Sequence, residues 1–140
     1  MDTVVTDPAG WDVLNARCPT RQVLDRVSGK WTMLVVTALT ADPVLRFSEL
    51  RRRVDGVTQK MLTQTLRELE RDGMVERTAY PTVPVTVEYK LTPLGHDLAE
   101  TVHVVRQWAY ANIEAIQEAR ARYDAAAPDR PGPPGSRLSA

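Results

Sequence analysis

This 140-residue chain contains one cysteine, one phenylalanine and only 6% aromatic residues. A single cysteine excludes a disulfide within the chain, so the fold must rely on packing and hydrogen bonds. The longest apolar run, Met33–Leu39, is interrupted by Thr37 and is far too short to span a bilayer. The first ten residues lack the basic start and apolar centre of a signal peptide. We therefore predict a cytoplasmic protein without a membrane partner.

The chain also lacks a net charge, because 18 Lys and Arg residues balance 18 Asp and Glu residues. No overall field therefore draws the protein towards nucleic acid. The sequence shows no paired carboxylates, no nucleophile with a matching base and no phosphate-binding loop. The two histidines, His96 and His103, lie seven residues apart on the predicted long helix and are interpreted as exposed helix residues. We predict no enzyme, cofactor or metal site, and any DNA binding must come from a local arrangement of side chains.

The strongest positive signal is the segment Thr58–Gly73, which predicts an amphipathic helix. Thr58 is a favourable N-cap, and Gly73 suits the position just past the C-terminus. One face is an apolar stripe at helical spacing, formed by Met61, Leu62, Leu66 and Leu69. The other face carries amide, hydroxyl and cationic groups, which hydrogen-bond to bases and phosphates in a DNA major groove. With Thr58, the predicted DNA-contacting residues of this helix are Gln59, Lys60, Thr63, Gln64 and Arg67.

The segments around this helix complete a winged helix-turn-helix pattern. A short helix over Phe47–Val54 precedes it through an Asp55-Gly56 turn. After it, residues 75–80 and 85–91 alternate as strands around a proline-containing loop, which indicates a hairpin, or wing. The predicted class is mainly α with a small antiparallel β-hairpin (α+β). Three further residues are predicted to contact DNA: Ser48 through a phosphate, and the cations Arg46 and Arg77.

The segments towards the two ends of the chain are predicted to include contacts with a second subunit. Two helices, from about Pro19 and over Trp31–Leu39, precede the helix-turn-helix. A long helix then runs from Pro93 to about Tyr123, with a narrow apolar seam that calls for a partner helix. The seam residues are Leu98, Val102, Val105, Ala109, Ile113 and Ile116. We predict an N-terminal arm over residues 1–17, one domain over residues 18–123 and a disordered tail over residues 124–140.

Cys18 lies directly before Pro19, at the predicted start of the first helix and between Arg17 and Arg21. A helix N-terminus and nearby cations both stabilise a thiolate, which favours a sensor thiol. A small buried residue without redox chemistry is the alternative interpretation, because free cysteines are commonly buried. With no second cysteine in the chain, oxidation would give an intersubunit disulfide or a mixed adduct.

Six segments, in their order and spacing, closely resemble the HxlR-type winged helix-turn-helix transcriptional regulators over about residues 18–123. They are Cys18-Pro19, Ser28-Gly29-Lys30-Trp31, Arg46-Phe47-Ser48-Glu49-Leu50, Gln59-Lys60-Met61-Leu62-Thr63, Leu66–Gly73 and Val87–Gly95. The resemblance implies a homodimer, built from the terminal helices, that binds a pseudo-palindromic operator as a repressor. It also implies a redox or electrophile response through Cys18, since several members use a cysteine at this position.

One departure from the family pattern concerns the wing. Members of the family often carry a proline and a basic residue where this chain has Val85 and Thr86. A cation at the wing tip would contact phosphate, so its replacement predicts a shallower salt dependence of binding. Two other functions are kept as alternatives. One is a repressor that binds a small-molecule effector without redox sensing, and the other is a winged-helix module that binds protein.

Overall fold

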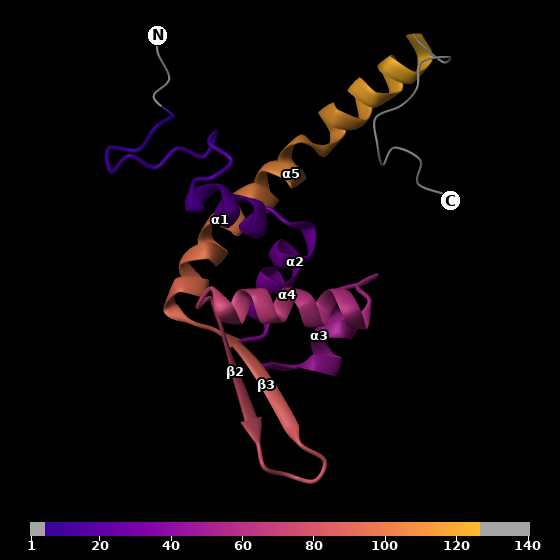
Figure 1. The fold of residues 1–140 in the computed structure, drawn as a ribbon. Coiled ribbons are helices and arrows are strands. Elements are labelled where there is room, and N and C mark those ends of the chain that lie inside the picture. The colour runs from indigo at the N-terminus through magenta and orange to yellow at the C-terminus, as the bar shows by residue number, and fades with distance from the viewer. Residues whose placement is uncertain (1–4, 127–140) are drawn as a thin grey trace. The chain divides into compact units, whose positions relative to one another are not determined.

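The computed structural model describes residues 5–126, and the chain divides into two compact units, Met1–His103 and Val104–Ala140. The described residues form five helices and a three-stranded antiparallel sheet with strand order β1-β3-β2 (Figure 1). The elements are α1 (Pro19–Val27), α2 (Lys30–Ala41), β1 (Leu45–Arg46), α3 (Phe47–Arg53), α4 (Gln59–Arg71), β2 (Val75–Tyr80), β3 (Thr86–Leu91) and α5 (Pro93–Ala126). The predicted fold class is confirmed.

The core of the first unit is built around α2 and the inner face of α4. Helix α2 is apolar along most of its length, and Val35, Val36 and Leu39 are fully buried. They meet Leu62 and Leu69, which α4 buries as completely. A helix that buries one face in this way is held by its packing, because a helix of this length is marginal in water. The opposite face of α4 is therefore presented on a rigid support.

Both ends of α4 have the predicted caps. The Thr58 hydroxyl accepts a hydrogen bond from the Met61 N–H over 3.1 Å. Gly73, just past the helix, has a φ of +77°, a left-handed conformation that favours glycine. The predicted apolar stripe is wrong at one position, since Met61 is 36% exposed. Thr65 is buried instead, and its hydroxyl donates to the Met61 carbonyl over 2.8 Å, so burial leaves no polar group unpaired.

The predicted hairpin is confirmed, although β3 begins at Thr86 and not at Val85. We call residues 75–91 the wing. The two strands pair over six residues, and the hairpin extends beyond α4 (Figure 1). The sequence did not predict β1, a strand of two residues that pairs with β3 on the side away from β2. Leu45 and Arg77 both lie opposite Tyr89, so the base of the wing is tied to the start of α3.

The junction between wing and α5 fixes the end of α4. Thr92 caps α5, because its hydroxyl accepts from the Gly95 N–H over 3.1 Å. The same hydroxyl donates to the Gly73 carbonyl over 2.6 Å. Gly95 lies so close to the Met74 carbonyl that a Cβ at this position would collide with it. Only glycine permits this approach, which locks the start of α5 against the residues that follow α4.

The start of α5 belongs to the core of the first unit, contrary to part of the predicted dimer seam. Val102 is 4% exposed and Leu98 packs partly buried against the core, so both serve the domain itself. In the second unit Val105 and Ile113 are exposed, at 47% and 42%. The helix ends at Ala126 and so includes three residues predicted as tail. The rest of that predicted tail, 127–140, and the first four residues of the predicted arm lie outside the described residues.

Candidate nucleic-acid interface

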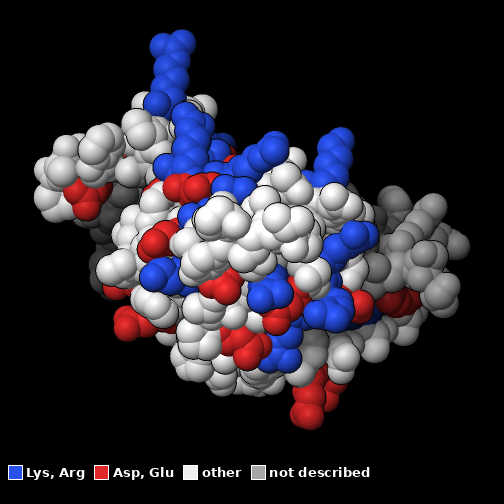
Figure 2. Space-filling view, turned by 90° about the horizontal axis from the view of Figure 1, so that it is seen from below, with Lys and Arg blue, Asp and Glu red and all other residues white. Residues whose placement is uncertain are grey.

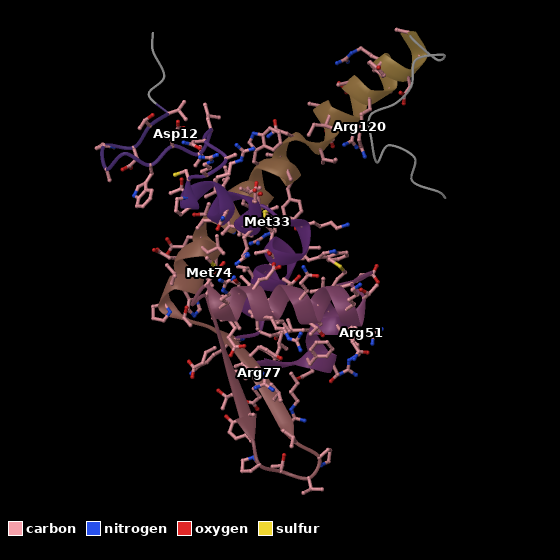
Figure 3. All side chains as sticks on the ribbon, viewed as in Figure 1. Asp12, Met33, Arg51, Met74, Arg77 and Arg120 are labelled. Carbon is pink, nitrogen blue, oxygen red and sulfur yellow. The ribbon has the colours of Figure 1, made fainter. Side chains whose placement is uncertain are left out.

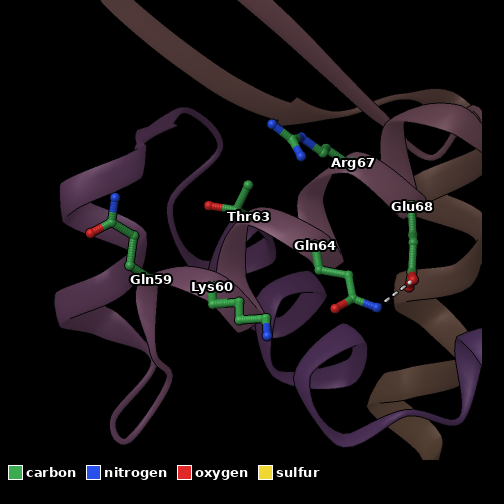
Figure 4. A pocket seen from close by; sticks show the side chains of 6 residues that line it. All are labelled: Gln59, Lys60, Thr63, Gln64, Arg67 and Glu68. Carbon is green, nitrogen blue, oxygen red and sulfur yellow. Dashed lines mark hydrogen bonds between the residues drawn. The ribbon is translucent and has the colours of Figure 1, made fainter.

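The outer face of α4 is a continuous polar surface formed by the residues that the sequence singled out. They line one open hollow together with a sixth residue, Glu68; the set is Gln59, Lys60, Thr63, Gln64, Arg67 and Glu68 (Figure 4). We call this set the α4 face. Thr63 and Glu68 are half-buried, and the other four side chains are exposed. Thr58 is exposed as well, but its hydroxyl is engaged by the cap.

A second hollow lies between α4 and the wing. It brings Arg67 from α4 together with Arg77 from β2, two cations ten residues apart in sequence. Figure 3 places Arg77 on the wing, below α4. The remaining lining residues are Phe47, Gln59, Thr63, Leu66, Glu70, Val87 and Tyr89. Guanidinium groups bind phosphate bidentately, so the two arginines can hold a nucleic-acid backbone between helix and wing.

Ser48 and Arg46 lie at the margin of this surface. Ser48 is exposed in the first turn of α3, where helix N–H groups are available to a phosphate. Arg46 is exposed on β1, and its backbone N–H donates to the Glu49 carboxylate over 2.9 Å. Phe47, between them, lines the second hollow. The two predicted residues thus flank that hollow without being part of its lining.

Charged side chains of both signs lie among uncharged ones on the face shown in Figure 2. Long Lys and Arg side chains project from one edge, and the acidic ones lie among further basic ones over the rest of that face. The consecutive Arg51, Arg52 and Arg53 are all exposed, and Arg53 forms an ion pair with Asp42 at 3.4 Å. The neutral overall charge is therefore distributed unevenly, so a local positive surface does not require a basic protein.

An ion-pair cluster that the sequence did not predict ties α1 to the end of α4. Arg26 Nη1 donates to both carboxylate oxygens of Asp72, over 2.9 and 2.8 Å. Arg26 Nε lies 3.8 Å from Glu68 Oε2. The Arg26 and Asp72 side chains are only 25% exposed. Since Arg26 and Asp72 stand 46 residues apart, no local spacing could have indicated this contact.

The wing tip differs in kind from the α4 face. Val83 is fully exposed and Val85 largely so. The loop is nevertheless ordered by Thr82, whose hydroxyl donates to the Pro84 carbonyl over 2.7 Å and accepts from the Thr86 N–H over 3.1 Å. The tip thus presents a fixed apolar surface without a cation in residues 81–86.

Cys18 is the N-cap residue of α1 and is half-buried. Hydrogen bonding lowers the pKa of its thiol, first through the Thr20 hydroxyl at 3.0 Å and then through the Asp12 N–H at 3.3 Å. The backbone N–H groups of Thr20 and Arg21, at the start of α1, lower this pKa further, while the Arg21 guanidinium donates to the Leu14 carbonyl over 3.2 Å. A lowered pKa raises the thiolate fraction near neutral pH, and the thiolate is the reactive form.

The described residues offer neither a metal site nor a membrane-spanning helix. Within residues 5–126, no three His, Cys, Asp or Glu side chains are grouped so that they could hold a metal ion. In the same part of the chain no helix has the length and apolar character needed to cross a bilayer. His96 and His103 are both exposed on α5.

Comparison with known proteins agrees with this geometry. The family model described as HxlR-like helix-turn-helix matches residues 26–117. The HTH-type transcriptional regulator YtfH of Escherichia coli K12 is 44% identical over 104 residues, which cover 74% of this chain and 82% of YtfH. The structure of transcriptional regulator ytfH from Salmonella typhimurium is 40% identical, with a TM-score of 0.75, over 79% of this chain and 98% of that one.

A third relative is named for redox regulation. The structure of the redox regulator HypR in its oxidized form is 42% identical to this chain, with a TM-score of 0.61. The match covers 68% of this chain and 97% of the HypR chain. The capped helix with a polar outer face, the wing and the family match lead to one conclusion. This chain belongs to the HxlR-like helix-turn-helix family of transcriptional regulators.

Proposed function

We propose that this protein is a homodimeric repressor that recognises a pseudo-palindromic DNA operator. The observation that carries the proposal is the α4 face, where amide, hydroxyl and cationic side chains stand on a capped helix with a buried inner side. A 13-residue helix is about 20 Å long, enough to cross a major groove roughly 12 Å wide. The first two turns enter the groove, and Arg67 with Arg77 contacts the backbone beside it.

The chemistry of the α4 face suits direct reading of bases. Gln59 and Gln64 match the donor and acceptor pattern of adenine, and Lys60 matches the acceptors of guanine or a phosphate. A protein-binding module is the competing function. Interfaces between proteins draw their affinity from Tyr, Trp and Arg anchors, and Arg67 is the α4 face's single residue of these types. Its composition therefore favours DNA.

Dimerisation follows from apolar side chains that the monomer leaves uncovered. In the second unit the exposed apolar residues include Val104, Val105, Trp108 and Ile113, and with Ala109 and Ile116 they form the proposed contact. In the first unit Trp11, Leu14, Val23 and Leu24 are exposed as well. Exposed apolar area of this kind marks an interaction surface. A dimer places two copies of α4 on half-sites about 34 Å apart, which accounts for a palindromic operator.

The test is a binding titration with DNA from upstream of the protein's own gene. Fluorescence anisotropy is measured for this duplex and for a scrambled duplex, at two salt concentrations. We expect nanomolar binding to the upstream duplex, at least a hundredfold tighter than to the scrambled one, with one dimer per site. Binding indifferent to sequence at both salt concentrations would sink the operator proposal and favour the protein-binding alternative.

We further propose that Cys18 is the signal-receiving group of this repressor. The lowered pKa of its thiol favours the proposal, as does the likeness to a protein named as a redox regulator. Diamide would remove one hydrogen atom from each of two Cys18 thiols and leave a disulfide between subunits. A quinone would instead be attacked by the thiolate and form a carbon–sulfur bond, with a proton taken up from water. Either product alters the region where α1 begins.

The sensor proposal is tested with two substitutions. Cys18→Ser should abolish the release of operator DNA by diamide. Thr20→Val removes the hydrogen bond that lowers the thiol pKa most, so the pH midpoint of Cys18 alkylation should rise and release at pH 7 should slow. If diamide releases operator DNA from Cys18→Ser as it does from the wild type, the thiol does not control binding. The signal would then be a small-molecule effector bound at the dimer interface.

A further inference from the structure

Glu68 lies at the edge of the α4 face and touches the base-reading Gln64, one turn earlier (Figure 4). Gln64 Nε2 donates a hydrogen bond to Glu68 Oε1 over 3.2 Å. An ionised carboxylate only accepts hydrogen bonds, so the nitrogen of the Gln64 amide, and not its oxygen, must face Glu68. Gln64 is exposed, and without this contact its amide could turn either way. Glu68 therefore selects one of two orientations.

The selected orientation of the Gln64 amide decides which base it can pair with. One N–H of the Gln64 amide is used by Glu68, which leaves the oxygen and the second N–H for a ligand. An adjacent acceptor and donor is the combination that pairs with the N6 and N7 atoms of adenine. The reversed amide would turn its oxygen towards the carboxylate, and repulsion between the two oxygens opposes that arrangement. The orientation of the Gln64 amide that prefers adenine is thus already set in the protein without DNA.

Arg26 holds Glu68 from the other side. Its Nε lies 3.8 Å from Glu68 Oε2, the oxygen that Gln64 does not use. Arg26 is itself anchored by two hydrogen bonds to Asp72. The guanidinium also offsets the negative charge of Glu68, which would otherwise repel the phosphates of a bound duplex. One cation from α1 thus keeps a carboxylate in place at the edge of a DNA-reading surface.

We propose that Glu68 is a positioning residue that sets the base preference of Gln64, and that Arg26 positions Glu68. The inference rests on the proposed function, because it requires α4 to lie in the major groove. Glu68 contacts no base in this scheme and acts through Gln64 alone. Its loss should weaken discrimination at the base pair read by Gln64 more than it weakens overall affinity.

The test uses Glu68→Gln, which keeps the size and the hydrogen bond but allows the new amide to donate as well as accept. Both orientations of Gln64 then become available. Binding is measured on the operator and on duplexes with single base-pair substitutions across each half-site. We expect the wild type to prefer A·T at one position, and Glu68→Gln to lose about fivefold to tenfold of that preference. Affinity for a scrambled duplex should stay the same or rise, because a negative charge is removed.

Two controls separate positioning from general effects. Glu100→Gln makes the same charge change at an exposed position of α5 that lines neither hollow, and it should keep the base preference. In a Gln64→Ala background Glu68→Gln should cause no further loss of discrimination, since the group that it positions is gone. Glu68 is 36% exposed, so the fold tolerates its replacement, and an unchanged melting temperature verifies this.

The possible failures are distinguishable. An equal loss of affinity for operator and scrambled DNA would assign Glu68 a merely structural role and overturn the inference. An effect that persists in the Gln64→Ala background, or an unaltered base preference, would overturn it as well. A wild-type protein that does not discriminate the operator at all would instead refute the proposed function, before any substitution is compared.

Discussion

Helix α4 and the wing tip both present side chains on the surface of the first unit, yet the chemistry of these side chains differs. Besides the Glu68 carboxylate, the α4 face has amide, hydroxyl and cationic side chains, and the opposite side of the helix buries Leu62 and Leu69 completely. The wing tip has Val83 and Val85, exposed and apolar, on a loop ordered by Thr82. The wing cation Arg77 stands on β2 and shares a hollow with Arg67. The groups that could make specific and electrostatic contacts with DNA are thus concentrated at α4, and residues 81–86 of the wing tip hold no cation.

The largest expected difference between the two regions is in stability. Leu62→Ala should lower the free energy of unfolding by about 3 kcal/mol, because it leaves a cavity beneath α4. Val83→Ala removes a side chain that is fully exposed. It should change the free energy of unfolding by less than about 0.5 kcal/mol. Urea denaturation measures both. Equal effects would mean that the wing tip is covered by another surface in solution.

Charge removal on α4 should weaken DNA binding more than the same change on the wing. Lys60→Ala deletes a cation of the α4 face and should reduce operator binding by about 1–2 kcal/mol per subunit. Lys90→Ala deletes an exposed lysine of β3 that forms an ion pair with Glu76, and should cost less than about 0.5 kcal/mol. Anisotropy titrations at one salt concentration compare them. The reverse order would move the main contact surface to the wing.

The ion pairs that brace α4 can be ranked in the same way. Arg26→Ala breaks a pair that is three-quarters buried and doubly hydrogen-bonded, and should destabilise the fold by about 1–2 kcal/mol. Arg53→Ala breaks the more exposed pair with Asp42, and should cost about 0.3 kcal/mol. The midpoints of urea unfolding of the two variants measure this difference in stability. Indistinguishable midpoints would show that α1 does not brace the end of α4.

The smallest effect concerns the neutral wing tip. Val83→Lys adds a cation at the most exposed position of the loop. If the tip approaches a phosphate, the slope of log K against log salt should steepen by about 0.9 per wing, with a modest gain in affinity. Val83→Ser alters polarity without charge and should leave the slope unchanged. An unaltered slope for Val83→Lys would place the tip away from the DNA backbone.

The sequence predicted α4 well because its signals are local. The cap at Thr58, the glycine at Gly73 and the polar face are all defined by spacing within one helix. Met61 was assigned to the buried side because hydropathy favours burying a methionine, yet Thr65 is buried in its place. Only the packing against α2 decides which of the two is covered, and a hydroxyl bonded to its own helix removes the usual cost of burying threonine.

The missed features all depend on residues far apart in the chain. A strand of two residues, β1, has too little pattern to predict, and it exists only because β3 offers it a partner. The seam assigned to α5 followed one helical stripe, but Leu98 and Val102 are covered by the domain's own core. The stripe alone does not indicate which of its residues pack against the protein's own core and which are left for a second chain.

By itself, the sequence determined the helices, the hairpin and the chemistry of the α4 face, because caps, periodicity and side-chain type are properties of neighbouring residues. The tertiary structure alone decided which charges meet. Arg26 contacts Asp72 and Glu68, which lie far from it in sequence, and Arg67 and Arg77 line one hollow beside the wing. These encounters depend on how α1 and the wing pack against α4. Coulomb and hydrogen-bond energies depend on distances in space, which local sequence spacing does not specify.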